Sequence, residues 1–319
     1  MPLISEDGYR PPALFKHAHY STIVPSQFRK VTGVVYQRER YSTPDGDFFD
    51  VDFSTTNSKK IAITLHGFEG NASRPYVLGM VRTLNQMDWD VASLNYRGCS
   101  GEINHFLKSY HSGTTDDIHQ LVLQLTKQGY EAIALIGFSL GGNLALKYVG
   151  EGRQLPNEVK AAIGLSVPIE LYPSAIEMGK TKNWVYGWRF KKRLLKKLRS
   201  KAHMIEDKAY YKELLNMRSL IHFDDIFTAR QFGYSNAVDY YTQNSTKQYL
   251  MNIEVPTLLV NALNDSFLPE VCYPLEAAKQ SKALFGQFPK YGGHCGFWQK
   301  GPTYWSEERT AWFLNEFVS

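Results

Sequence analysis

Gly137-Phe138-Ser139-Leu140-Gly141 follows an apolar run, Ala132–Ile136, and precedes a segment of helical composition, Asn143–Tyr148. A G-x-S-x-G pentapeptide between a strand and a helix forms a sharp turn with an exposed serine at its tip. Glycines are needed there because the arms of the turn pass too close for a Cβ atom. The helix that follows points its first N–H groups toward negative charge. The pattern therefore predicts a nucleophilic Ser139, and the flanking strand and helix disfavour the alternative of a glycine-rich turn with an incidental serine.

A serine hydroxyl becomes a good nucleophile only beside a base that is itself oriented by an acid. The last third of the chain offers both partners. Thr257–Asn261 reads as a buried strand, and Asp265 follows it in turn-forming residues. His294 lies in a glycine-rich loop after a further apolar stretch, Ala283–Phe288. A turn-capping aspartate and a surface histidine are the plain alternatives, but the order serine, acid, histidine favours a catalytic triad.

Motifs that extend along nearly the whole length carry a family resemblance; they are Arg38–Arg40 with Asp45–Asp52, His66–Gly70 with Pro75 and Tyr76, Asn95–Glu102, Gly137–Asn143, Phe232–Tyr234 with Asp239–Tyr241, and Gly292–Phe297. Together they resemble the YheT-like branch of the α/β hydrolases, which is related to the ABHD-type membrane-associated hydrolases of eukaryotes. The resemblance implies an α/β-hydrolase fold and a hydrolase of esters in which Ser139, Asp265 and His294 form the triad. The segment from Lys180 to Asp207 has no motif that matches the family pattern.

The resemblance also implies an oxyanion hole, the pair of N–H groups that binds the negative oxygen of the reaction intermediate. The strand Ile61–Leu65 ends in the His-Gly turn that the family uses for this purpose. By position, the donors are the backbone N–H groups of Phe68 and Leu140. We expect His66 to orient this loop through its ring nitrogens rather than to bind a metal or act as a second base.

The organisation of the chain agrees with a single α/β domain that carries an insertion. From residue 61 strands alternate with helices, which is typical of a mostly parallel central sheet with helices on both faces. We expect residues 1–169 to form the first part of the core, 170–245 a helical cap and 246–319 the second part. Strands are expected at 31–41, 48–53, 61–65, 91–95, 132–136, 160–165, 257–261 and 283–288, and helices near 75–87, 114–128, 140–149, 270–280 and 303–317. Residues 1–30, with Pro11, Pro12 and Pro25, are expected to be irregular.

The positive net charge comes from one segment. The chain has 36 Lys and Arg against 31 Asp and Glu, and eight of the basic residues lie in 189–201, leaving 28 for the rest. A nucleic-acid partner is therefore not expected. Within 189–201, Phe190, Leu194 and Leu198 form a helical apolar stripe opposite a cationic face. We expect a lid helix with solvated lysines, and weak contact with an anionic membrane surface is the alternative.

Several classes of protein are disfavoured. No run of 18 apolar residues exists, and the first seven residues lack the basic start and apolar core of a signal peptide. Three cysteines without C-x-x-C spacing favour a reducing, cytoplasmic setting. No cofactor and no metal site is expected, since His17 and His19 lack a third partner.

The sequence thus predicts a serine hydrolase acting on a small-molecule carboxylic ester. Aromatic residues of the expected cap, such as Trp184, Tyr186 and Trp188, suggest a medium-length apolar acyl chain. An acyltransferase or thioesterase with the same triad remains open, as does a catalytically silent lipid-binding scaffold.

Overall fold

A computed structural model describes residues 3–4 and 8–318 of the chain. Most of the first seven residues, which are not expected to form a signal peptide, lie outside the described residues. An eight-stranded sheet forms its centre, with the strand order β1-β2-β4-β3-β5-β6-β7-β8. The strands are β1 (Gln37–Ser42), β2 (Phe48–Ser54), β3 (Lys60–Leu65), β4 (Asp90–Asn95), β5 (Ala132–Phe138), β6 (Val159–Leu165), β7 (Thr257–Val260) and β8 (Leu284–Gln287). Strands β1 and β2 are antiparallel, and the neighbours from β4 to β8 are parallel. The predicted mostly parallel sheet is confirmed.

The first strand is shorter than expected. The expected strand covers 31–41, but β1 begins at Gln37. Gly33 has a φ of +85°, which lies outside the extended region and interrupts any strand that includes it. In the hairpin of β1 and β2, Ser42 pairs with Phe48, so residues 43–47 form the turn.

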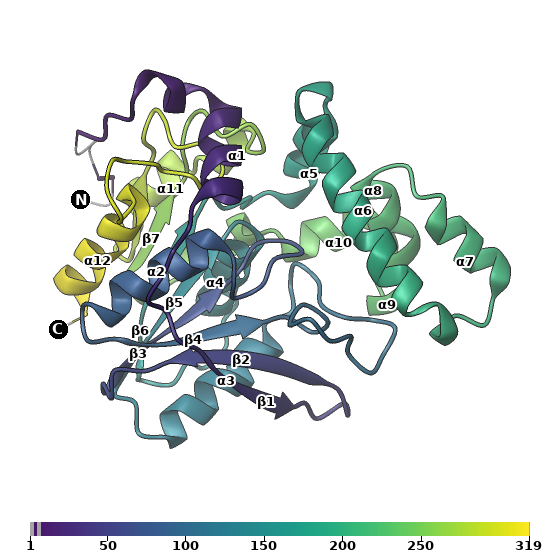
Figure 1. The fold of residues 1–319 in the computed structure, drawn as a ribbon, viewed down its shortest axis with the longest axis horizontal. Helices are drawn as coiled ribbons and strands as arrows, with labels where there is room; N and C mark the ends of the chain where they lie inside the picture. Colours follow the sequence, from purple (N-terminus) through teal and green to yellow (C-terminus); the bar gives the residue numbers. More distant parts are fainter. Residues whose placement is uncertain (1–2, 5–7, 319) are drawn as a thin grey trace.

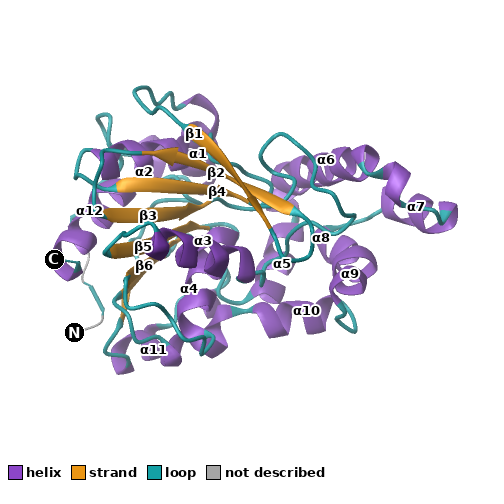
Figure 2. Ribbon diagram, turned by 90° about the horizontal axis from the view of Figure 1, so that it is seen from below, coloured by secondary structure: helices purple, strands orange, loops and turns teal. Residues whose placement is uncertain are grey.

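Helices cover both faces of the sheet (Figures 1 and 2). Helices α2 (Pro75–Asn85) and α12 (Trp305–Phe317) pack on one face, where Met80 and Phe313 are buried. The opposite face carries α3 (Asp116–Lys127), α4 (Leu140–Gly150) and α11 (Leu275–Gln280). The helix expected near 270–280 is divided, because a short 3₁₀ turn at Glu270–Cys272 precedes α11 and Pro274 separates the two.

The expectation that residues 1–30 are irregular is wrong. Ala18–Phe28 form the helix α1, which includes Pro25. Proline disfavours a helix interior because it has no N–H to donate and its ring crowds the preceding turn. Contacts with distant residues outweigh this local signal, and Figure 1 shows α1 beside the loops of the C-terminal part of the chain.

A helical segment connects β6 to β7 and stands to one side of the sheet (Figure 1). Its α-helices are α5 (Leu171–Gly179), α6 (Trp184–Ser200), α7 (Lys208–Leu215), α8 (Leu220–Phe223), α9 (Arg230–Phe232) and α10 (Ala237–Asn244). A π-helical stretch, Asp224–Ala229, joins α8 to α9. We call this segment, residues 171–244, the cap. It has its own apolar cluster, in which Leu194 and Leu214 are buried.

Candidate active site

The turn between β5 and α4 holds Ser139 in a strained backbone conformation. Its φ is 54° and its ψ is −119°, a combination that residues with side chains rarely adopt. A Cβ atom at Gly137 would lie 2.1 Å from the carbonyl oxygen of Gly141, and one at Gly141 would lie 2.1 Å from that of Leu65. Glycine is therefore required at both positions, for the steric reason that the sequence suggested.

Three predicted residues meet beside this turn. Nε2 of His294 lies 2.8 Å from Oγ of Ser139, and Nδ1 of His294 lies 2.7 Å from Oδ2 of Asp265. The second carboxylate oxygen of Asp265 accepts the backbone N–H of Phe267 at 2.9 Å. Since an ionised carboxylate can only accept, the hydrogen of the neutral imidazole lies on Nδ1 and leaves Nε2 free to accept from the serine. The structure thus brings Ser139, His294 and Asp265 into one hydrogen-bonded chain.

The histidine loop is held by parts of the chain that sequence reasoning did not connect to it. The backbone N–H of His294 donates to Oγ1 of Thr22 in α1 at 2.9 Å. The N–H of Cys295 donates to Oγ of Ser166 at 2.8 Å, just beyond the end of β6. The first contact was missed because the proline-containing segment 1–30 carried no helical signal. No local pattern in the sequence could have identified it.

The residues expected to form the oxyanion hole flank Ser139. Gly67 approaches so closely that a Cβ atom there would lie 3.3 Å from Cβ of Ser139. The N–H of Gly67 donates to the hydroxyl of Tyr76 at 3.1 Å, which fixes the loop just before Phe68. Within the described residues the N–H groups of Phe68 and Leu140 have no acceptor, as the first N–H of a helix ordinarily lacks one. One unpaired donor, Leu140, therefore follows the serine in sequence, and the other, Phe68, follows Gly67, which contacts the serine in space.

His66 fills the orienting role predicted for it. Its Nε2 accepts the backbone N–H of Tyr96 at 3.3 Å, so Nδ1 carries the hydrogen and donates to the carbonyl oxygen of Gly67 at 2.8 Å. The ring is buried, and burial lowers the pKa of His66 to about 3. A neutral ring bonded on both sides ties the oxyanion loop to the end of β4 and has no role as a base.

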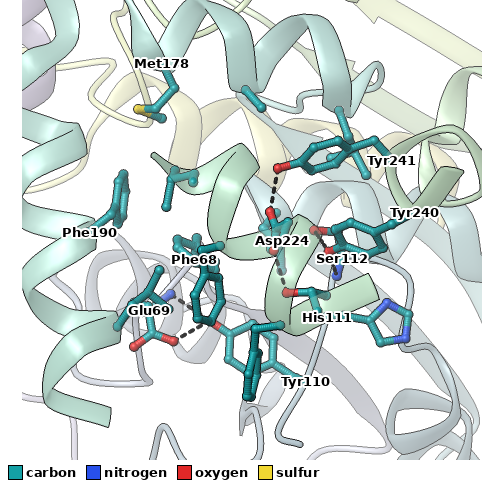
Figure 3. Close-up of a pocket in the computed structure, with 18 of the residues that line it drawn as sticks. Phe68, Glu69, Tyr110, His111, Ser112, Met178, Phe190, Asp224, Tyr240 and Tyr241 are labelled. Carbon is teal, nitrogen blue, oxygen red and sulfur yellow. Dashed lines mark hydrogen bonds between the residues drawn. The ribbon is translucent and has the colours of Figure 1, made fainter. Parts of the chain in front are cut away.

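A largely apolar cavity opens from Ser139 into the cap (Figure 3). It has an empty volume of about 1210 Å³, part of it open to solvent. Its apolar walls come from the oxyanion loop, α4 and the cap and include Phe68, Leu140, Met178, Phe190, Leu194 and Leu198. The apolar stripe expected on the 189–201 helix therefore faces this space. We call it the apolar cavity.

Two carboxyl side chains, Glu69 and Asp224, line the apolar cavity. Asp224 accepts hydrogen bonds from the hydroxyls of Thr228 and Tyr241, each at 2.5 Å (Figure 3). Burial raises the pKa of Asp224 to about 6. Its neighbour Asp225 accepts the N–H of Ala237 instead. Neither aspartate is hydrogen-bonded to the candidate base, so neither competes with Asp265 for the orienting role.

The cap aromatics do not line the apolar cavity as expected. The exposed fractions of Trp184 and Trp188 are 65% and 58%, and both side chains lie on the outer face of α6. Tyr186 faces a second cavity on the other side of Ser139. Helical geometry explains the exposure of the tryptophans, because Trp184 and Trp188 precede Phe190 by six and two residues and so lie on other faces of the helix. Tyr186 precedes Phe190 by four residues and shares its face, and both line the second cavity.

The expectation that the lysines of 189–201 are solvated is wrong for two of them. Nζ of Lys197 forms an ion pair with Glu69 at 2.6 Å, next to the oxyanion loop. Lys201 is 2% exposed and donates to Asn104 and Ser109 and to the carbonyl oxygens of residues 106 and 107. The acceptors of Lys201 come from the segment between β4 and α3, and Glu69 comes from the loop after β3. Only the tertiary structure brings them to α6.

Three further features bear on function. In the described part of the chain, no group of three or more His, Cys, Asp or Glu residues could hold a metal ion. His19, one of the paired N-terminal histidines, shares a hydrogen bond with the hydroxyl of Tyr186 at 3.0 Å. No helix among the described residues is long and apolar enough to cross a membrane.

The sequence profile of the alpha/beta hydrolase fold matches residues 63–301. This range includes the cap and the strands from β3 to β8, and it leaves out the hairpin of β1 and β2. The chain belongs to the α/β-hydrolase family. The expected branch is confirmed too: the hydrolase is 33% identical to YheT of Escherichia coli (strain K12), named as an esterase, over 95% of this chain and 92% of that protein.

Other relatives of the hydrolase have ester-cleaving names. It is 29% identical to phospholipase ABHD3 of Homo sapiens over 85% of this chain and 70% of that protein. Among solved structures it resembles the esterase Pf2001 of Pyrococcus furiosus, with a TM-score of 0.58, 17% identity and coverage of 91% and 99% of the two chains. At that identity the likeness supports the fold alone. The hydrolase family therefore places this chain among esterases and lipases.

Proposed function

We propose that the protein is a serine hydrolase of carboxylic esters, with Ser139 as nucleophile, His294 as base and Asp265 as the acid that orients the base. The observation that carries the proposal is the hydrogen-bonded chain from Asp265 through His294 to Ser139, at a strained turn that opens into an apolar cavity. The esterase and phospholipase names of its relatives support an ester as substrate.

The proposed reaction proceeds through an acyl-enzyme. Oγ of Ser139 attacks the ester carbonyl carbon while Nε2 of His294 takes the serine proton, and the carbonyl oxygen becomes the oxyanion of a tetrahedral intermediate. The N–H groups of Phe68 and Leu140 bind that oxyanion, and each donor of this kind contributes about 3–4 kcal/mol to lowering the barrier. His294 then protonates the leaving alcohol, and a water activated by the same imidazole releases the acid and restores Ser139.

The apolar cavity is the proposed acyl site. Phe190, Leu194 and Leu198 remove an alkyl chain from water, at a gain of about 0.8 kcal/mol for each buried CH₂ group. We propose a medium-length chain, since apolar side chains of the cap line the cavity beyond Ser139. Its polar groups are already paired: Asp224 with two hydroxyls, and Lys197 with Glu69.

A fluorophosphonate probe and p-nitrophenyl esters test the proposal together. Wild-type protein should be labelled at Ser139 and should turn over the esters, while Ser139→Ala should lose both and keep the wild-type melting temperature. Turnover by Ser139→Ala within tenfold of wild type would exclude this nucleophile. An unlabelled wild type would indicate the silent lipid-binding scaffold.

Adding alcohol or thiol acceptors to the same assay separates hydrolysis from acyl transfer. A hydrolase forms the free acid at a rate that acceptors barely change, whereas an acyltransferase converts the acyl-enzyme to a new ester or thioester. Thioester substrates of matched chain length test the thioesterase alternative. The three free cysteines fit the reducing, cytoplasmic setting that we propose for this reaction.

A further inference from the structure

Ser139 lies at the junction of two cavities, and the second differs from the apolar cavity in charge. It has an empty volume of about 1130 Å³ and runs from Ser139 and His294 toward α1 and the first half of α6. Phe68, Phe190 and Phe267 line both cavities, so these aromatic rings form the boundary between them. We call the second one the arginine cavity.

Besides Arg29, which is paired with Glu307, three arginines line this cavity from two separate elements. Arg189 and Arg193 lie one turn apart on α6, and Arg74 immediately precedes α2. Two like charges four residues apart destabilise a helix. The third arginine adds to this repulsion: burial and the charge of Arg74 lower the pKa of Arg189, and burial with the charges of Arg74 and Arg189 lowers that of Arg193 to about 10.

Within the described chain no carboxylate forms an ion pair with Arg74, Arg189 or Arg193, although the charge of Glu69 partly offsets that of Arg193. The one acidic side chain that lines the arginine cavity, Glu307, is bound on both oxygens by Arg29. Glu69, the nearest acid to Arg193, directs its carboxylate to Lys197 and to the hydroxyl of Tyr110. Three cations thus share a partly buried space that holds no free anion, an arrangement that fits an anionic ligand.

A purely structural role explains only part of the cluster. Arg193 and Arg74 donate to the backbone carbonyl oxygen of Glu69, at 2.8 and 3.3 Å, and so hold the loop that carries Phe68. Arg189 donates no hydrogen bond to any described residue, although it is only partly exposed and lies beside the reacting groups. Its guanidinium is available for a ligand.

We propose that the arginine cavity binds the alcohol portion of the ester and that this alcohol carries a phosphate group, which Arg189, Arg193 and Arg74 bind. The proposal rests on the hydrolase function proposed above, and it gives the two cavities separate tasks: the apolar one takes the acyl chain and the cationic one the leaving group. The shared chemistry is an acylated alcohol phosphate, either a small soluble molecule or a lipid with its headgroup.

A pair of soluble esters that differ by one phosphate provides the kinetic test. The pair is 1-hexanoylglycerol and 1-hexanoylglycerol 3-phosphate, used below the concentration at which either aggregates. We expect wild type to have the higher kcat/KM for the phosphate ester. Arg189→Gln should reduce that preference about ten- to a hundredfold, the effect of one hydrogen bond to a charged group.

Lys196→Gln is the matched control. It removes the same charge from the same helix, at an exposed position that lines neither cavity. Its preference for the phosphate ester should equal that of wild type. Equal losses in Arg189→Gln and Lys196→Gln would show that net charge alone causes the preference, and would overturn the proposal.

Vesicles of phosphatidylcholine that contain phosphatidic acid distinguish the two sources of phosphate. If the preference for the phosphate ester depends on Arg189 only when the substrate is in these vesicles, the ligand is a lipid headgroup. If it depends on Arg189 with the soluble hexanoyl pair, the ligand is a soluble phosphate. Both outcomes support the phosphate site. A preference that depends on Arg189 in neither assay overturns it.

A binding measurement separates this proposal from the proposed catalysis. Titration of glycerol 3-phosphate into Ser139→Ala by calorimetry needs no turnover. Binding that is lost in Ser139→Ala/Arg189→Glu but kept in Ser139→Ala/Lys196→Glu supports the site even if the wild-type protein hydrolyses no ester. Absence of binding in Ser139→Ala, together with normal hydrolysis of the neutral ester by wild type, overturns the phosphate site and leaves the hydrolase function intact.

Discussion

Thr22 and His294 are 272 residues apart in sequence, yet Oγ1 of Thr22 accepts the backbone N–H of His294 at 2.9 Å. The contact places a residue of α1 directly behind the candidate base. Oγ1 of Thr22 in turn donates to the carbonyl oxygen of Ala18 at 2.8 Å, so α1 fixes the position of the acceptor. The segment expected to be irregular is therefore a positioning element of the site.

We expect Thr22→Val to lower kcat about tenfold, because the N–H of His294 loses its acceptor and a buried unpaired donor costs about 1–3 kcal/mol. Thr22→Ser keeps the hydroxyl and should restore most of the lost rate. Steady-state kinetics on a p-nitrophenyl ester measures both. A serine variant as slow as the valine variant would indicate that the methyl group and packing matter, and not the hydrogen bond.

Asp265→Asn should lower turnover by about 10⁴-fold, because an amide at this position favours the wrong tautomer of the base. The fold should remain, since the amide oxygen can still accept the N–H of Phe267. Asp224→Asn and Asp225→Asn are the matched controls and should each change kcat far less. A larger loss in either control than in Asp265→Asn would show that a different acid orients His294.

The pKa of Asp224 predicts a specific change of stability with pH. Burial raises it from 3.8 to about 6, so between pH 4 and 6 the unfolded chain releases a proton that the folded protein keeps. This group therefore makes the protein less stable as the pH rises through that window, by up to about 3 kcal/mol, and adds no further change above it.

Asp224→Asn should remove this contribution. The difference in unfolding free energy, Asp224→Asn minus wild type, should rise between pH 4 and pH 7. The lost hydrogen bonds shift this difference by a constant amount and do not change its rise. Urea unfolding at several pH values measures it, and Asp225→Asn provides the control. A pH-independent difference would mean that folding does not change the pKa of Asp224.

The exposed basic residues of α6 test the remaining question of membrane contact. Lys192, Lys196 and Arg199 are exposed, whereas Lys197 is paired with Glu69 and unsuited to the test. A membrane-bound helix loses about 1 kcal/mol per basic residue removed, so changing all three to glutamine would weaken vesicle binding by about a hundredfold. We expect instead an unchanged ratio of hydrolysis of soluble and vesicle-borne esters. Co-sedimentation of wild type with anionic vesicles, lost in the triple variant, would show that the helix contacts membranes.

Sequence alone predicted the central architecture well because its signals are local. The turn at Ser139 requires glycines within two residues on each side, and buried parallel strands such as Ile133–Leu135 are continuous apolar runs. One error arose where distant contacts outweighed local preference, since Pro25 lies inside α1. Another arose from composition: Trp184 and Trp188 lie on the outer face of α6, because the helical phase of a residue decides whether it faces a cavity.

The amino-acid sequence by itself determined the order of the strands and helices of the core and the three residues placed for a triad, since each lies in a turn that follows an apolar run. Only the tertiary structure decided what surrounds them. Lys197 lies inside and Lys196 outside because the acceptor Glu69 comes from another element, 128 residues earlier. Arg74 and Arg189 are likewise far apart in the chain and come near each other only when the cap folds against the core. The repulsion between their charges therefore exists only in the folded protein.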